Sequence, residues 1–159
     1  MQLKHLLDNP VWEALATEDA RLNCGTEVIR YFAEDVSPFV GMKHWDDHDL
    51  AMLEKELPSD RNFSVMIANQ VRIPDCFEVV FTTPLYQMVC TSFHPIFNSS
   101  LIMRSLDAAD VPAMLALTSL TKPGPFSQRT IDFGHYIGIL DGDKLLAMAG
   151  ERLHVEGYT

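Results

Sequence analysis

The last quarter of the chain shows the clearest pattern, two apolar runs separated by a short polar turn. Residues 135–140 form the first run, and residues 144–153 form the second, which is apolar until Gly150 and charged afterwards. Asp141-Gly-Asp143 lies between them, and Asp-Gly between apolar runs is a strong hairpin signal because such a turn needs positive φ at its central residues. The pattern predicts a β-hairpin over 135–153.

A helical repeat of apolar residues follows the start of the chain. Asn9 is expected as the N-cap and Pro10 at the first helical position. The apolar residues recur at helical spacing as far as Leu22, and Gly25 is a plausible stop signal. A helix is predicted from residue 10 to the low twenties.

A second helix is expected after Asp107, where Asp110 follows three residues later in a pattern similar to a capping box. Pro112 fits only the first turn of a helix, so Asp110 is the alternative cap. A break at 122–125 and a short helix or turn at 126–133 follow. The apolar face of the predicted helix consists of Met114, Leu115, Leu117, Thr118 and Leu120.

Short runs of β-branched and aromatic residues predict strands elsewhere in the chain. Residues 85–90 are apolar but too short for the periodicity to decide between strand and helix. The strands are expected at 28–32, 63–68, 71–73, 77–81 and 101–105.

The densest polar cluster is His44-Trp-Asp-Asp-His-Asp49. His44 and His48 are four residues apart beside carboxylates, as in some metal sites, but a third spaced ligand is missing. The favoured interpretation is a helix start, in which the aspartates complement the positive end of a helix that runs to Leu57 and closes at Pro58.

Composition narrows the class of protein. The 159 residues include 22 acidic and 12 basic side chains, a net charge of -10, which argues against a nucleic-acid partner. Three widely spaced cysteines suggest reduced thiols. No secretion signal and no stretch long enough to span a bilayer are recognised, so a cytoplasmic protein without a membrane partner is expected.

The predicted elements form an α/β (α+β mixed) chain in two parts. Residues 1–97 are expected to be an N-terminal mixed α/β region, and residues 98–159 a strand-helix-helix-hairpin unit. The boundary is placed in the polar, proline-broken stretch between residues 91 and 100.

The chain resembles the GNAT superfamily of N-acetyltransferases, in a bacterial branch with an N-terminal extension. The match rests on the order of elements in the second part and on a series of short sequence segments. These segments are Leu7–Leu15, Val36–Phe39, Leu106–Leu117, Lys122–Thr130, Phe133–Ile139 and Leu146–Leu153.

The resemblance implies acetyl transfer from acetyl-CoA to an amine of a small molecule or peptide, without a metal. Such proteins hold the cofactor pyrophosphate on an Arg/Gln-x-x-Gly-x-Gly loop of backbone amides at a helix N-terminus. That pattern does not occur in these residues, so the chain is expected to end before the loop. The alternative is a non-catalytic, truncated or degenerate module that serves as an interaction or dimerisation surface.

Glu151 is the candidate catalytic residue, because it follows the apolar run of the hairpin and a carboxylate accepts the amine proton in such enzymes. The alternative for Glu151 is an ion pair with Arg152 or Arg129. Phe126, Arg129 and Tyr136 are candidate acceptor-binding residues by resemblance, and ordinary core packing is the alternative for both aromatic residues.

The second hairpin strand is apolar on both faces, which is typical of a strand buried inside a wider sheet. An unpaired edge there would invite another chain. We therefore expect a homodimer or a complementary fragment to pair with it.

Overall fold

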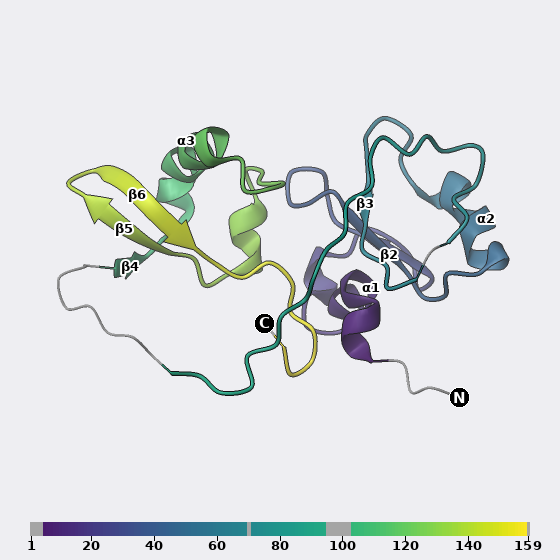
Figure 1. Ribbon diagram of the computed structural model, residues 1–159. Coiled ribbons are helices and arrows are strands. Elements are labelled where there is room, and N and C mark those ends of the chain that lie inside the picture. Colours follow the sequence, from purple (N-terminus) through teal and green to yellow (C-terminus); the bar gives the residue numbers. More distant parts are fainter. Residues whose placement is uncertain (1–4, 70, 95–102, 159) are drawn as a thin grey trace.

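The computed structural model describes residues 5–69, 71–94 and 103–158, and it contains two groups of elements, each built on a small sheet (Figure 1). The first group has two α-helices, two 3-10 turns and three strands. Its elements are η1 (Leu6–Asp8), α1 (Pro10–Ala16), η2 (Ala20–Leu22), β1 (Ile29–Tyr31), β2 (Phe39–Met42), α2 (Asp47–Glu56) and β3 (Ser64–Val65).

The first sheet has the order β1-β2-β3, with β2 antiparallel to β1 and parallel to β3. All four residues of β2 are buried, which means that both faces of this strand are covered. Helix α1 packs against β1 and β2, and α2 contacts β1. The central strand of this sheet is therefore interior, whereas β1 and β3 are only partly buried.

Helix α1 is shorter than the sequence pattern predicts. It ends at Ala16, and Leu22 lies in the separate turn η2. Pro10 is at the first helical position as expected, but the Asn9 side chain makes no capping hydrogen bond. Its amide is buried and donates instead to the carbonyl oxygen of Met42 at 2.6 Å, which ties the start of the helix to β2.

Helix α2 confirms the helix-start interpretation of the polar cluster. Asp46 is its N-cap and accepts a hydrogen bond from the backbone N–H of Asp49. Asp47 and Asp49 lie in the first turn, where they complement the helix dipole. His44 and His48 are exposed.

The second group consists of β4 (Met103–Ser105), η3 (Ala108–Asp110), α3 (Val111–Thr121), η4 (Thr130–Phe133), β5 (Ile137–Asp141) and β6 (Lys144–Ala149). Its sheet is antiparallel with the order β4-β5-β6. The predicted hairpin is confirmed as β5 and β6. Gly142, with a φ of 57°, and Asp143 form the turn, and only the glycine has positive φ, as in a type II′ turn.

Helix α3 lies over the sheet, and its capping matches the sequence pattern (Figure 1). Asp107 and Asp110 form a reciprocal capping box at η3, and Pro112 falls in the first turn of α3. Met114 and Thr118 are buried, whereas Leu120 is exposed, so its assignment to the apolar face is wrong. The helix ends at Lys122 in the left-handed conformation, immediately before Pro123.

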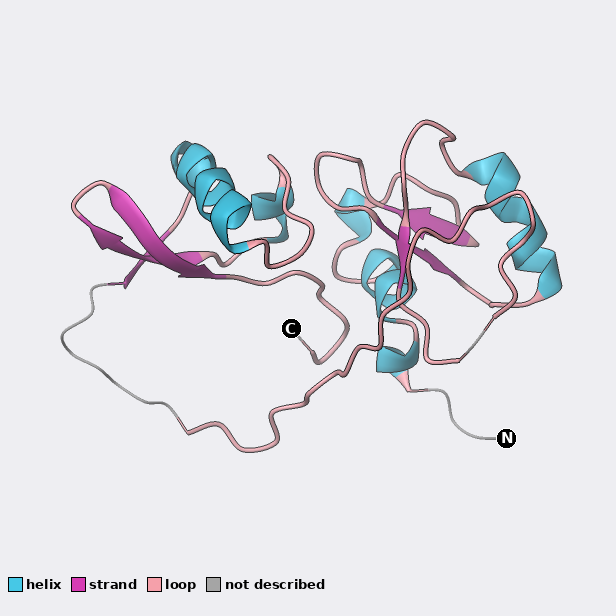
Figure 2. Cartoon of the chain, turned by 45° about the horizontal axis from the view of Figure 1, so that its top comes forward, coloured by secondary structure: helices cyan, strands magenta, loops and turns pink. Residues whose placement is uncertain are grey.

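The strands predicted between residues 63 and 90 are mostly wrong. Only Ser64–Val65 forms a strand, while residues 71–73, 77–81 and 85–90 have no regular structure. Their apolar side chains include Phe81, Tyr86 and Met88, which are all exposed. These segments pair with no strand of the described part of the chain, and strand propensity alone cannot supply a partner. Figure 2 shows this stretch as a loop, much of which winds around the first group. Leu101 and Ile102, from the strand predicted at 101–105, lie outside the described residues.

The two groups share one of the three buried apolar clusters. Phe133 of η4 packs edge-on against Phe32, with ring centroids 5.1 Å apart, inside a cluster that also contains Val11, Leu15 and Val36. Leu153 packs against the same cluster. Nearby, the Thr130 hydroxyl donates to the carbonyl oxygen of Val36 at 2.8 Å. The division of the chain near residue 97 stays a prediction.

Candidate functional site

Glu151 lies just beyond β6, where the chain leaves the hairpin and crosses to the first group (Figure 1). One of its carboxylate oxygens, Oε2, lies 2.5 Å from Nδ1 of His135 and 2.7 Å from Nε2 of His154. The ion pair with Arg152 or Arg129 considered above is therefore wrong. Arg152 donates instead to the carbonyl oxygen of Pro125 at 2.6 Å.

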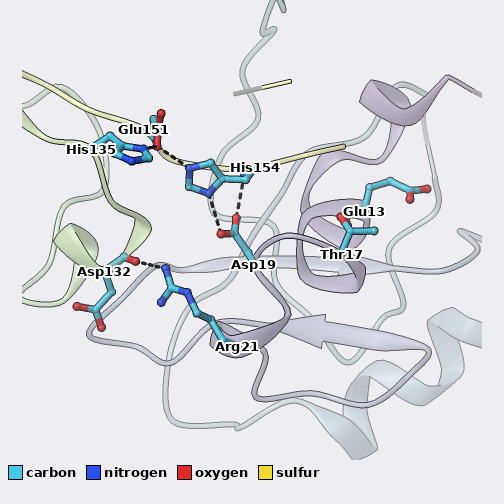
Figure 3. A network of polar contacts seen from close by, with 8 residues as sticks. All are labelled: Glu13, Thr17, Asp19, Arg21, Asp132, His135, Glu151 and His154. Carbon is cyan, nitrogen blue, oxygen red and sulfur yellow. Dashed lines mark hydrogen bonds and ion pairs between the residues drawn. The ribbon is translucent and has the colours of Figure 1, made fainter. Parts of the chain in front are cut away.

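His154 is fixed from its other side by Asp19 (Figure 3). The Asp19 carboxylate accepts the backbone N–H of His154 at 2.9 Å and lies 2.8 Å from the ring Nδ1. Only 1% of Asp19 is exposed, and its backbone N–H donates to the carbonyl oxygen of Ala14 at 2.8 Å. The end of α1 therefore holds the carboxylate that orients His154.

The local backbone also explains how His135 reaches Glu151. His135 has a left-handed φ of 47° and follows Gly134, whose φ is 105°. Gly150 leaves room for the ring of Tyr136, because a Cβ at this glycine would lie 2.2 Å from Cδ1 of that ring. These unusual positions bring residues 135 and 151 together at the open end of the hairpin.

The electrostatics of this group keep Glu151 charged. Hydrogen bonding, first from His154 and then from His135, lowers the pKa of Glu151 below its ordinary value. Burial lowers the pKa of His154, but the hydrogen bonds and charges of Glu151 and Asp19 together outweigh it and raise that pKa. Two neighbouring carboxylates stabilise the protonated form of an imidazole, so the His154 ring is expected to carry a positive charge.

The group borders an open cavity of about 410 Å³. Arg21 on its wall donates to the carbonyl oxygen of Asp132. Acidic, basic and aromatic side chains all line this space, so it suits a polar ligand with an apolar part. The lining includes Glu18, Asp19, Arg21, Phe133, His135 and His154.

The three candidate acceptor residues lie away from Glu151 or have structural partners. Phe126 and Tyr136 meet edge-on with centroids 6.0 Å apart, in the core beneath α3. Burial raises the pKa of Tyr136. Arg129 pairs with Asp132 at 2.8 Å and with Asp35 at 3.5 Å, at the contact between the two groups.

A second open cavity, of about 360 Å³, lies at the end of α3, and Phe126 contributes to its wall. Thr118, Ser119 and Lys122 line the same space. Of the three candidates, Phe126 is therefore the residue that borders a cavity.

Sequence reasoning missed Asp19, His135 and His154. The spacing Glu151-x-x-His154 was a usable signal, since it joins two metal- or proton-binding side chains. Asp19 could not have been found, because it precedes His154 by 135 positions.

Comparison with known proteins identifies the fold. The chain matches no protein-family model and no curated protein sequence. It is similar to a crystal structure from Novosphingobium aromaticivorans DSM 12444, a GNAT-family protein assigned as an acetyltransferase, with a TM-score of 0.82 and 30% identity. The match covers 95% of this chain and 66% of that one.

The chain therefore belongs to the GNAT superfamily, and the expected α/β fold class is confirmed. It spans about two thirds of the length of the acetyltransferase that it matches. Among the described residues, no helix is long and apolar enough to cross a bilayer.

Proposed function

We propose that this chain forms the acceptor-side part of an N-acetyltransferase, which transfers an acetyl group from acetyl-CoA to an amine of a small molecule or peptide. Membership of the GNAT superfamily supports the reaction class. The observation that carries the assignment of a site is the contact of Glu151 Oε2 with His135 and His154, two residues that line an open cavity.

In this proposal Glu151 accepts the proton that the amine loses as it becomes a nucleophile. A carboxylate suits this role only if it is ionised and reachable. The pKa of Glu151 is lowered, and its side chain is half-buried between two residues of the cavity wall. The proton would pass to the other carboxylate oxygen, Oε1, because Oε2 already lies 2.5 Å and 2.7 Å from two imidazole nitrogens.

Phe126, Arg129 and Tyr136 remain candidates for the acceptor side. Phe126 would contribute an apolar wall in the cavity beside α3. Tyr136 would act indirectly, because it is buried against Gly150 and so supports the backbone next to Glu151. Arg129 would hold the contact between the two groups through Asp35.

The described residues do not fit the cofactor's pyrophosphate. A loop of the Arg/Gln-x-x-Gly-x-Gly type is missing from the 159 residues, and α3 begins with Asp110 at its N-cap and Pro112 in its first turn. An aspartate repels phosphate, and a proline lacks the N–H that would bind it. We propose that the pyrophosphate site is supplied from outside these residues.

Apart from the pyrophosphate site, the edge of β6 is a proposed pairing surface. In the sheet order β4-β5-β6, this strand is terminal, and Leu146 on it is 47% exposed. We propose that a second copy of the chain pairs there. Light scattering would show a dimer for the wild type and a monomer for Leu146→Lys, whose charge opposes edge pairing; a monomeric wild type would contradict the proposal.

The function is tested by an acetyl-transfer assay with acetyl-CoA and a panel of amines. Glu151→Gln should lower the rate by about 10²–10⁴-fold, as loss of a general base does. Glu156→Gln is the matched control, since Glu156 is exposed in the turn after β6. An unchanged rate in Glu151→Gln would contradict the role of Glu151.

Acetyl-CoA binding is measured separately by thermal unfolding. A ligand at a hundredfold excess over its dissociation constant stabilises by about 2.7 kcal/mol. No transfer to any amine, together with no stabilisation, would favour the non-catalytic module over the enzyme.

A further inference from the structure

The contact between His135, Glu151 and His154 brings together three atoms with lone pairs at the wall of the larger cavity. We propose that His135 Nδ1, Glu151 Oε2 and His154 Nε2 form a binding site for a divalent transition metal, with zinc as the best-fitting ion. The ligand set of two imidazoles and one carboxylate is one that zinc takes in sites with an open fourth position. The inference goes beyond acetyl transfer and does not depend on it.

The hydrogen-bond partners of His154 favour a metal at its Nε2 atom. Asp19 is an acceptor, so Nδ1 of His154 carries a proton toward it at 2.8 Å. Nε2 is then the ring atom that faces Glu151 Oε2 at 2.7 Å, as a proton donor in the charged ring and with a lone pair in the neutral ring. A metal ion can take the place of the proton that otherwise lies between these two atoms.

The third ligand distinguishes a metal from a bridging proton. His135 Nδ1 reaches the same oxygen at 2.5 Å, and the three ligand atoms lie within 4.8 Å of one another. A proton bridges two atoms, whereas a metal ion binds all three. Metal ligation of Nδ1 of His135 leaves its Nε2–H free to face water.

The distances require only a small adjustment. Zinc bonds of about 2.0–2.2 Å place tetrahedral ligands about 3.3 Å apart, so the present contacts must open by less than about 1 Å. The side chain of His135 is 83% exposed and can move outward without disturbing the core. His154 can remain fixed, because Asp19 holds both its ring and its backbone.

Asp19 has the place of the carboxylate that commonly orients a metal-binding histidine. Such a partner fixes the tautomer and makes the ligating nitrogen more basic. The cavity of about 410 Å³ gives the ion a path from solvent, since His135 and His154 both line it. The excess of acidic residues in the chain also favours the approach of cations.

The other histidine pair considered from the sequence does not form a comparable group. His44 and His48 are exposed at the start of α2, and the carboxylates of Asp46 and Asp49 accept backbone N–H groups there. Among the described residues, three metal-type ligands gather at His135, Glu151 and His154.

The experiment titrates the tag-free, metal-stripped chain with Co²⁺ and Zn²⁺, without acetyl-CoA. Co²⁺ reports geometry by its visible absorption, which is intense for a tetrahedral site and weak for an octahedral one, and calorimetry gives the Zn²⁺ affinity. The variants are His135→Ala, Glu151→Gln and Asp19→Asn, with His48→Ala as the matched control.

We expect a stoichiometric, intense Co²⁺ spectrum and a Zn²⁺ affinity that falls at least tenfold in His135→Ala and Glu151→Gln. Asp19→Asn should cost about 10–100-fold, as loss of an outer carboxylate does. His48→Ala should match the wild type. His135→Ala keeps the test valid if a buried variant fails to fold, since this side chain is exposed.

A weak octahedral spectrum, or equal Zn²⁺ affinity in the wild type and His135→Ala, would overturn the site. Because neither measurement involves acetyl transfer, an inactive enzyme leaves this result unaffected. If both proposals hold, Zn²⁺ will inhibit acetyl transfer, since a bound cation makes the Glu151 carboxylate a weaker acceptor for the amine proton.

Discussion

The two sheets of this protein differ in how much of their surface is covered. In the first, every residue of β2 is buried, with helices α1 and α2 packed against the sheet. In the second, β4 is wholly exposed, and most of β6 is as well. Met103, Ile137 and Leu146 are the large apolar side chains exposed on the strands of the second sheet.

This difference separates the part of the molecule whose buried apolar area stabilises the fold from the part whose apolar area is still exposed. Apolar area gains free energy only when it leaves water. Most apolar area of the first sheet and of the cluster around Phe133 is already buried, whereas the second sheet still exposes apolar side chains to solvent. An exposed surface of this kind commonly marks an interaction site.

The largest effect is expected at the shared core. Phe133→Ala should lower the free energy of unfolding by about 3–5 kcal/mol, the usual cost of deleting a buried aromatic ring. Phe133 packs against Phe32 and other residues of the first group, so both groups should lose stability together. Urea unfolding followed by far-UV circular dichroism measures this, and two separate transitions would show that the groups are independent.

The comparison of the sheets is tested most directly by a matched pair of isoleucines. Ile29 in β1 has no exposed surface, and Ile137 in β5 is 41% exposed. Ile29→Ala should cost about 2–5 kcal/mol, and Ile137→Ala clearly less. Equal losses in urea unfolding would mean that the second sheet is covered as well, which a partner chain could cause.

A smaller effect is expected at the helix cap of the second group. Asp107→Ala removes the side chain that accepts from the backbone N–H of Ala109 at 2.8 Å. The expected loss is about 1 kcal/mol. Asp107→Asn is the control, because an amide oxygen can still accept this hydrogen bond, and a loss as large as that of alanine would contradict the capping role.

The smallest effect concerns pH. Arg104 donates to Asp110 at 2.7 and 2.6 Å and lowers the pKa of this carboxyl from 3.8 to about 2. Since the folded-state pKa is depressed, the stabilisation is present above the unfolded value and is lost as the pH falls through about 2. Carbon-detected NMR titration measures the pKa directly. Arg104→Gln should return it towards 3.8, and an unchanged value would contradict the ion pair.

The sequence predicted those parts of the fold that depend on neighbours in the chain. The β5–β6 hairpin follows from Asp-Gly between apolar runs, and the start of α3 follows from Asp107 and Asp110. The strands predicted at 71–73 and 77–81 are wrong, because a strand also depends on a partner that propensity cannot identify.

The same distinction applies to the candidate site. Glu151 could be singled out from its place after an apolar run, but its partners depend on the packing of distant segments. Its nearest predicted partners, Arg152 and Arg129, bind elsewhere. His135 reaches it only because of a left-handed backbone, and Asp19 because the end of α1 lies beside residues 151–154.

The pairing of Asp19 with His154 joins residues 135 positions apart, nearly the whole length of the chain. Closing so large a loop loses configurational entropy before the stabilising contacts can form. Folds rich in such distant contacts therefore form slowly. The cavity beside Glu151 should therefore be completed late in folding, after the hairpin and the helices. In a hydrogen-exchange experiment, the amide protons of residues 151–155 should then exchange through opening reactions of lower free energy than those of β2.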